Sequence, residues 1–139
     1  MRITVIPRIA ALLALSLAGF AHAGTLEVQL SNLRPTGQVR VSIFADAQSW
    51  EHNKPLASQL VPARDTRFLV RFSGLAPGHY AVRAEQEQGG GHELVQRLLL
   101  ARYGTSGNRS ERRTPFAAAA VEVIDDPLVD VHMFTEGRY

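Results

Sequence analysis

The sequence predicts an all-β protein, a single antiparallel β-sandwich that follows a cleaved leader. Apolar residues recur at every second position in several short stretches, which is the period of a strand with one exposed face. Gly- and Pro-containing segments separate these stretches, at intervals that are typical of a sandwich. Apolar residues make up 45% and charged residues 20% of the 139 residues, which is the balance of an ordinary folded domain.

The first 23 residues have the three-part order of an export signal. They contain a positively charged start, an uncharged and mostly apolar run, and a small-x-small exit, which are Arg2 with Arg8, residues 9–20 and residues 21–23. A membrane-spanning helix needs about 20 apolar residues, so this run is too short to span a membrane. We expect cleavage after Ala23, which leaves residues 24–139 as one domain in the periplasm or outside the cell.

The predicted mature domain has no net charge and no Cys. Removing Arg2 and Arg8 with the leader leaves 15 − 2 = 13 basic side chains against 13 acidic ones. Binding to nucleic acid depends on surplus positive charge, so this class of partner is disfavoured. The absence of Cys excludes disulfide scaffolds, thiolate zinc sites and cysteine nucleophiles.

The alternation predicts about six strands in the mature domain, at residues 25–30, 38–43, 67–72, 80–85, 121–123 and 129–133. Turn signals at residues 34–37 and 125–127 predict that the first strand pairs with the second and the fifth with the sixth. Gly and Pro at residues 74–78 supply a tight connection between the middle strands. The polar stretch at residues 46–55 is predicted to be a loop, with Trp50 as its apolar anchor.

Residues 92–103 fit two kinds of secondary structure. Four apolar residues have helical spacing, and Gly104 stands where a helix would end, so one short helix around residues 93–102 is predicted. The three leucines at residues 98–100 also suit a buried strand. The sequence leaves both interpretations open.

Four segments occur in an order that resembles a known family. They are GQVRVSIF at residues 37–44, FSGLAPGHYAV at residues 72–82, YGTSGN at residues 103–108, and Pro115-Phe116. The ordered set resembles the DUF2141 family of exported bacterial proteins and covers nearly the whole mature domain. The resemblance implies a small β-sandwich akin to transthyretin-like or immunoglobulin-like modules, with no established activity.

The sequence departs from this family at residues 86–95. Family members usually carry a run of Asp and Asn here, whose alternating oxygens look like part of a calcium loop. This chain has Gly89, Gly91 and Val95 at positions where the family has such side chains. Glu87 and Glu93 supply too few oxygens for Ca²⁺, which prefers 6 to 8 ligands. We therefore expect a flexible glycine-rich loop, with no metal and no cofactor.

Two residues near the C-terminus are the best candidates for catalysis. Asp130 and His132 lie two apart on a predicted strand, so both point to one face and can form an acid-oriented imidazole. Ser106 or Ser110 can in principle complete a hydrolytic set, but neither lies in a Gly-x-Ser-x-Gly elbow. The simpler interpretation is a solvated strand face, and we expect no enzyme activity.

Five arginines fall in a segment that contains Glu111 as its one acid, and they are Arg97, Arg102, Arg109, Arg112 and Arg113. Guanidinium groups bind phosphate, sulfate or carboxylate with bidentate geometry, which predicts an anion-binding segment. The alternative is a loop whose charge offsets the acidic turn around Asp125 and Asp126. Trp50 either caps one end of the sandwich or is an exposed contact for a ligand.

These observations favour an exported, non-enzymatic accessory or binding module of the bacterial cell envelope. A small-ligand carrier of transthyretin-like type and a hydrolase are the alternatives. The expected partner is an envelope protein, a glycan or a small anionic ligand, without stable insertion into a membrane. Residues 26–30 and 129–133 are the terminal strands, and because terminal strands often lie at sheet edges, a homodimer is a further possibility.

Overall fold

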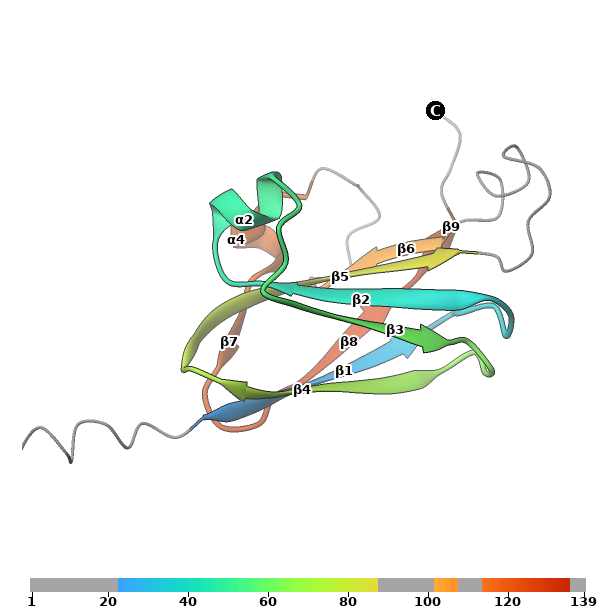
Figure 1. Cartoon of the computed structure of the whole chain (residues 1–139), viewed down its shortest axis with the longest axis horizontal. Coiled ribbons are helices and arrows are strands. Elements are labelled where there is room, and N and C mark those ends of the chain that lie inside the picture. The colour runs from blue at the N-terminus through green and yellow to red at the C-terminus, as the bar shows by residue number, and fades with distance from the viewer. Residues whose placement is uncertain (1–22, 88–101, 108–113, 136–139) are drawn as a thin grey trace, which may run out of the picture.

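Two β-sheets pack face to face in the computed structural model of the chain (Figure 1), which describes residues 23–87, 102–107 and 114–135. One sheet has the strand order β4-β1-β8, and the other has the order β3-β2-β5-β6-β9, with β7 paired to β5. This arrangement confirms the prediction of an all-β sandwich.

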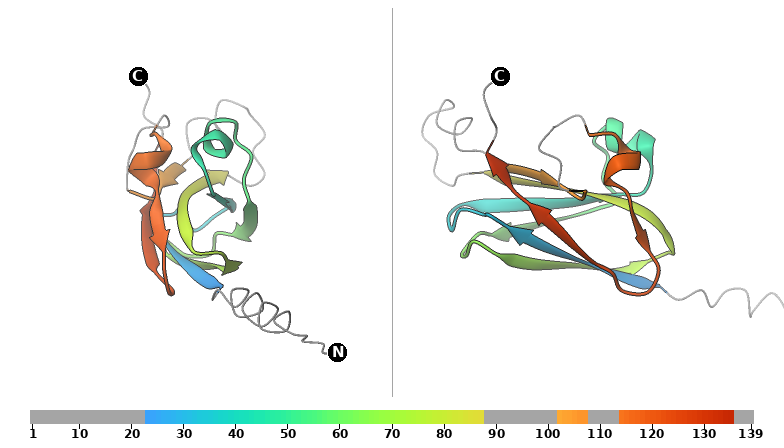
Figure 2. Two further views of the ribbon diagram at one scale, coloured as in Figure 1. Left: turned by 90° about the vertical axis from the view of Figure 1, so that its left-hand side faces the viewer. Right: turned by 180° about the vertical axis from the view of Figure 1, so that it is seen from behind.

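The elements have the following bounds. The strands are β1 (Gly24–Ser31), β2 (Gln38–Phe44), β3 (Ala57–Pro62), β4 (Phe68–Leu75), β5 (Gly78–Glu87), β6 (Arg102–Thr105), β7 (Val121–Val123), β8 (Leu128–His132) and β9 (Phe134–Thr135). The two short helices are α2 (Ala47–Glu51) and α4 (Phe116–Ala119). They lie side by side at one end of the sandwich (Figure 2).

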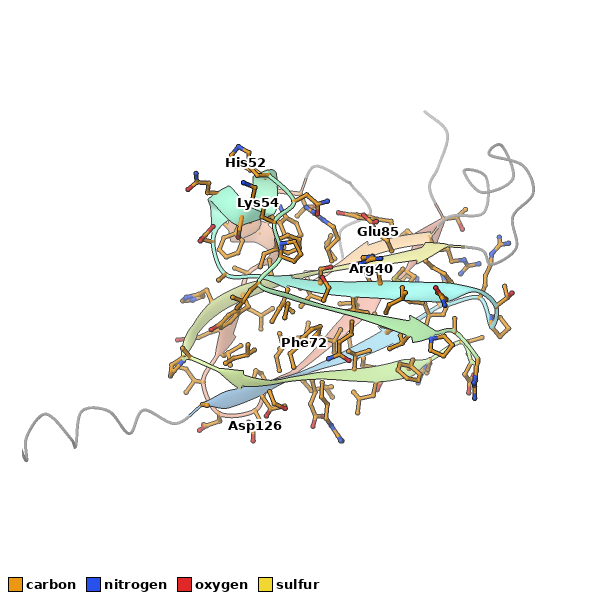
Figure 3. The ribbon with its side chains drawn as sticks, in the orientation of Figure 1. Arg40, His52, Lys54, Phe72, Glu85 and Asp126 are labelled. Carbon is orange, nitrogen blue, oxygen red and sulfur yellow. The ribbon has the colours of Figure 1, made fainter. Side chains whose placement is uncertain are left out.

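The core forms between the inner faces of the two sheets because apolar residues alternate along the strands. Leu26, Val28 and Leu30 of β1 are fully buried, and Phe72 of β4 points into the same space (Figure 3). In the opposite sheet, alternate residues of β2 are equally buried, for example Val41. Burial of each large apolar side chain stabilises the fold by about 1.5–3 kcal/mol, so packing can hold this chain together without disulfides.

The predicted strand pairings are wrong, although the strands themselves are present. β1 pairs with β4 and β8, and β2 pairs with β3 and β5. β7 pairs with β5 rather than with β8. The pairing of β1 with β8 is parallel, so the sandwich is not antiparallel throughout. Turn residues signal that the chain reverses, but they do not say whether it stays in one sheet or crosses to the other.

The polar stretch at residues 46–55 contains a helix that the sequence analysis did not predict. Asp46 caps α2 with its carboxylate, which accepts a hydrogen bond of 2.7 Å from the amide N–H of Ser49, as N-cap residues commonly do. β3 was also not predicted. Its residues ASQLVP are mostly exposed, and so they lack the apolar alternation on which the other predictions depend.

The sandwich is closed differently along its two sides. On one side, β8 pairs with β1 in the first sheet. The chain then crosses to the second sheet and continues as β9, which pairs with β6. β6 passes so close that a Cβ on Gly104 would lie 2.6 Å from the carbonyl oxygen of His132. On the other side, β3 and β4 end their sheets, and the side chain of Gln59 donates a hydrogen bond of 2.5 Å to the carbonyl oxygen of Arg71.

The segment with two open interpretations is described only at its end. Residues 102 and 103 belong to strand β6, and residues 92–101 lie outside the described residues. Within the ranges that the structure describes, no helix has the length and apolar character needed to cross a membrane.

Candidate functional site

Of the predicted anion-binding arginines, the structure places Arg102. Arg97, Arg109, Arg112 and Arg113 lie outside the described residues. Arg102 begins β6 at the end of the sandwich where β1 gives way to the loop at residues 32–37. Its Nη1 donates a hydrogen bond to the carbonyl oxygen of Asn32, so the guanidinium is attached to this loop.

The same loop carries a second arginine, Arg34, and the side chain of a buried residue of β5 holds its main chain in place. The side chain of Gln86, which is only 2% exposed, accepts a hydrogen bond of 3.0 Å from the amide of Arg34. Its Nε2 donates to the carbonyl oxygens of Arg34 and Thr36, at 2.6 and 3.0 Å. Gln86 therefore holds the loop much as a neighbouring strand would, and it fixes the main chain at Arg34.

The two arginines place two positive charges close together at this end of the sandwich. Burial, and next the nearby charge of Arg34, lower the pKa of Arg102 below its usual value. Among the described residues, an acidic and a basic side chain approach within 4.0 Å, nitrogen to oxygen, at Arg71 and Glu27. Neither Arg34 nor Arg102 therefore has an acidic partner among the residues that the structure describes. The Nε of Arg102 is buried and makes no hydrogen bond with any residue that the structure describes. An anion bound here would offset the repulsion between the two cations.

Trp50 belongs to a small second cluster at the opposite end. It is 3% exposed, and its Nε1 donates a hydrogen bond of 2.7 Å to the carbonyl oxygen of Thr114. Its ring meets Phe44 edge to face at 5.1 Å, and the guanidinium of Arg83 lies 4.0 Å from the ring centroid. These contacts fit the interpretation of Trp50 as a cap, and they leave almost none of its ring exposed to a ligand.

Ser106 is a structural residue in this fold, not an accessible nucleophile. It is fully buried, and its Oγ accepts a hydrogen bond of 2.8 Å from the amide of Val82. The same hydroxyl donates to the carbonyl oxygen of Ala119 at 2.6 Å. The serine thus links β5 to the end of α4 where β6 stops. Ser110, the other candidate serine, lies outside the described residues.

Asp130 and His132 both lie exposed on the outer face of β8, as predicted. The parallel pairing brings Ser31 opposite His132, with 3.4 Å between Ser31 Oγ and His132 Nδ1. No local pattern in the sequence signals this neighbour, because it arises from strands about a hundred residues apart. Ser31 and His132 lie on an open, exposed face of the sheet. This environment differs from that of catalytic sites that hold fixed dipoles in a space from which water is excluded.

The described residues hold no cluster that suits a metal ion, that is, no group of three or more His, Asp or Glu side chains. Glu87 ends β5, and Glu93 lies outside the described residues. A hollow of about 180 Å³ is present beside α2, where Figure 3 labels His52 and Lys54. It is open and lined by exposed side chains, so nothing there fixes the orientation of a ligand.

Comparison with known proteins identifies a family. Residues 28–131 match the family model described as "Uncharacterized protein conserved in bacteria (DUF2141)". This match covers well over half of the chain and agrees with the resemblance noted in the sequence. No curated protein and no solved structure matches the chain.

Proposed function

Because the chain belongs to the DUF2141 family, we propose that it is an exported, non-enzymatic binding module of the bacterial cell envelope. The site that supports this proposal is the arginine end, which we define as Arg34, Arg102 and the loop that carries Arg34. Its ligand is an anionic group, a phosphate, sulfate or carboxylate of an envelope glycan or lipid.

One observation carries the choice of an anion. The guanidinium of Arg102 is bonded to the loop that carries Arg34, Gln86 holds the main chain of Arg34, and neither arginine has an ion-pair partner among the described residues. Arginine holds such groups with two parallel N–H bonds, which gives orientation as well as affinity. The packing between the sheets favours a ligand site on the surface over the internal site that a small-ligand carrier would need. The side chains of Val28, Val41 and Val131 between the sheets are fully buried and packed in one cluster.

The test measures binding to a phosphorylated sugar. Glucose 6-phosphate is titrated into the purified mature protein, with glucose as the neutral control, and amide shifts of residues 32–37 are followed by NMR. Hydrogen bonds to charged groups contribute about 1.5–3 kcal/mol, so Arg34→Ala should raise Kd about ten- to a hundredfold. Arg40→Ala, an exposed arginine on the outer face of β2, should leave Kd unchanged. Equal losses in both variants would refute a specific site.

A second measurement separates a lipid head group from a soluble anion. Vesicles of phosphatidylglycerol bind the protein if the anion belongs to a lipid, and phosphatidylcholine vesicles do not. Binding to the sugar phosphate alone assigns the ligand to a glycan. Export is tested by fractionating cells and sequencing the N-terminus, where a mature protein that begins at Gly24 is expected and an intact precursor in the cytosol would contradict it.

A further inference from the structure

β3 is an edge strand whose outward main-chain groups are available to another strand. Among the described strands it pairs only with β2, from Gln38 opposite Pro62 to Ile43 opposite Ala57. The amide of Ala63 bonds the carbonyl oxygen of Gly37 in this register. Because hydrogen-bonded residues alternate in an antiparallel pair, residues 57, 59 and 61 bond to β2. The main-chain groups of Ser58 and Leu60 therefore point away from the sheet.

This edge is less protected than the edge of β4 beside it. On the β4 edge, the carbonyl oxygen of Arg71 accepts a hydrogen bond from the side chain of Gln59. The side chain of Arg71 forms an ion pair with Glu27 at 3.2 Å. On β3, by contrast, Leu60 is 52% exposed, and the adjoining Leu56 is 59% exposed. Proteins usually blunt such edges with charges, proline or bulges. Pro62 ends β3, but the middle of the strand carries no charge.

We propose that β3 is a homodimer interface, in which β3 of a second copy pairs antiparallel with it about a two-fold axis at Gln59. In this register the N–H and C=O of Ser58 bond the C=O and N–H of the partner's Leu60. The axis repeats these two bonds, so four main-chain bonds form, and the two sheets join into one. The partner is thus a second copy of this chain, paired edge to edge.

Self-complementarity of the exposed side chains selects a second copy over another extended peptide. The register places Leu60, which is 52% exposed, opposite the partner's Ser58 and diagonal to the partner's Leu60 on the same face, within reach of a long side chain. Arg40 lies opposite Glu85 in the register of β2 and β5 (Figure 3), one strand inside the edge. Residues 57–62 carry no charge, so no like charges lie opposite one another within the two paired strands, where they would destabilise the pair.

A single cysteine tests the two-fold geometry, because the chain has no Cys of its own. Gln59 faces the partner's Gln59 in a pair that is not hydrogen-bonded, whose Cα atoms lie about 4.5 Å apart, a separation that a disulfide can bridge. Gln59→Cys in the mature protein should therefore form a covalent dimer on mild oxidation. Ser73→Cys, on the exposed β4 edge, should stay monomeric. Absence of cross-linking at Gln59→Cys would overturn the register.

Sedimentation velocity tests the dimer without cysteine. The wild-type mature protein should dimerise with rising concentration, and Leu60→Lys should shift the dissociation constant at least tenfold toward monomer. Leu128→Lys makes the same change at a residue that is 59% exposed on the outer face of the other sheet, and it should leave the equilibrium unaltered. A monomeric wild type at every concentration, or a dimer that Leu60→Lys does not weaken, would refute the proposal.

Discussion

Replacing Ser106 by alanine tests whether this hydroxyl is a structural link between the two layers. If the ladder between β5 and β6 continued one residue further, the amide of Val82 would bond the carbonyl oxygen of Ser106, but it bonds Ser106 Oγ at 2.8 Å instead. The hydroxyl proton goes to the carbonyl oxygen of Ala119 at 2.6 Å. Alanine removes both bonds while it leaves the bond from the Ser106 amide to the Val82 carbonyl oxygen in place.

The magnitude follows from the burial of the two partners. Val82, Ser106 and Ala119 are all fully buried, so the amide and the carbonyl group lose their partner where water does not replace it. An unsatisfied buried polar group costs about 1–3 kcal/mol. For the two groups together we expect the free energy of unfolding to fall by about 2–6 kcal/mol. At about 4 °C per kcal/mol for a domain of this size, Tm should fall by about 8–24 °C.

Urea unfolding followed by far-ultraviolet circular dichroism measures the change. The midpoint should fall while the slope m stays constant, because the surface exposed on unfolding is the same. Ser73→Ala is the matched control, since Ser73 is exposed on β4 and its loss should change stability by less than about 0.5 kcal/mol. A loss at Ser106 as small as that of the control would show that the hydroxyl does not link β5 to α4.

Three further substitutions test other parts of the fold by the same unfolding measurement. Trp50→Ala should cost about 3–5 kcal/mol because it empties the cluster under α2, and a loss under 1 kcal/mol would mean that the ring caps nothing. Gly104→Ala should cost about 1–3 kcal/mol, since its Cβ would meet the carbonyl oxygen of His132 at 2.6 Å; an unchanged Tm would contradict this close approach. The bond from the Ser49 amide holds the pKa of Asp46 below its usual 3.8. The stability advantage of wild type over Asp46→Ala should be complete above pH 3.8 and shrink as the pH falls below it, whereas a difference that is constant with pH would exclude the charged cap.

The strands could be predicted from the sequence because burial of one face imposes the alternation directly. β1 illustrates this, since its apolar residues at 26, 28 and 30 are all fully buried. The pairing of strands could not be predicted, because partners such as β1 and β8 lie about a hundred residues apart and share no local signal. α2 was missed for a related reason, since its polar sequence resembles a loop and a single buried ring, that of Trp50, fixes it.

The arginine end shows which part of a proposed binding site local patterns can reveal. A cluster of like charges is visible in the sequence, and it predicted Arg102. Arg34 was not predicted, because it is separated from Arg102 by 68 positions and is brought to it by the fold. A signal was nevertheless present at Gln86, which continues the inward-facing series of Val82 and Ala84 on β5. A polar residue at a core position must find hydrogen-bond partners, and here those partners are the main-chain groups that position Arg34.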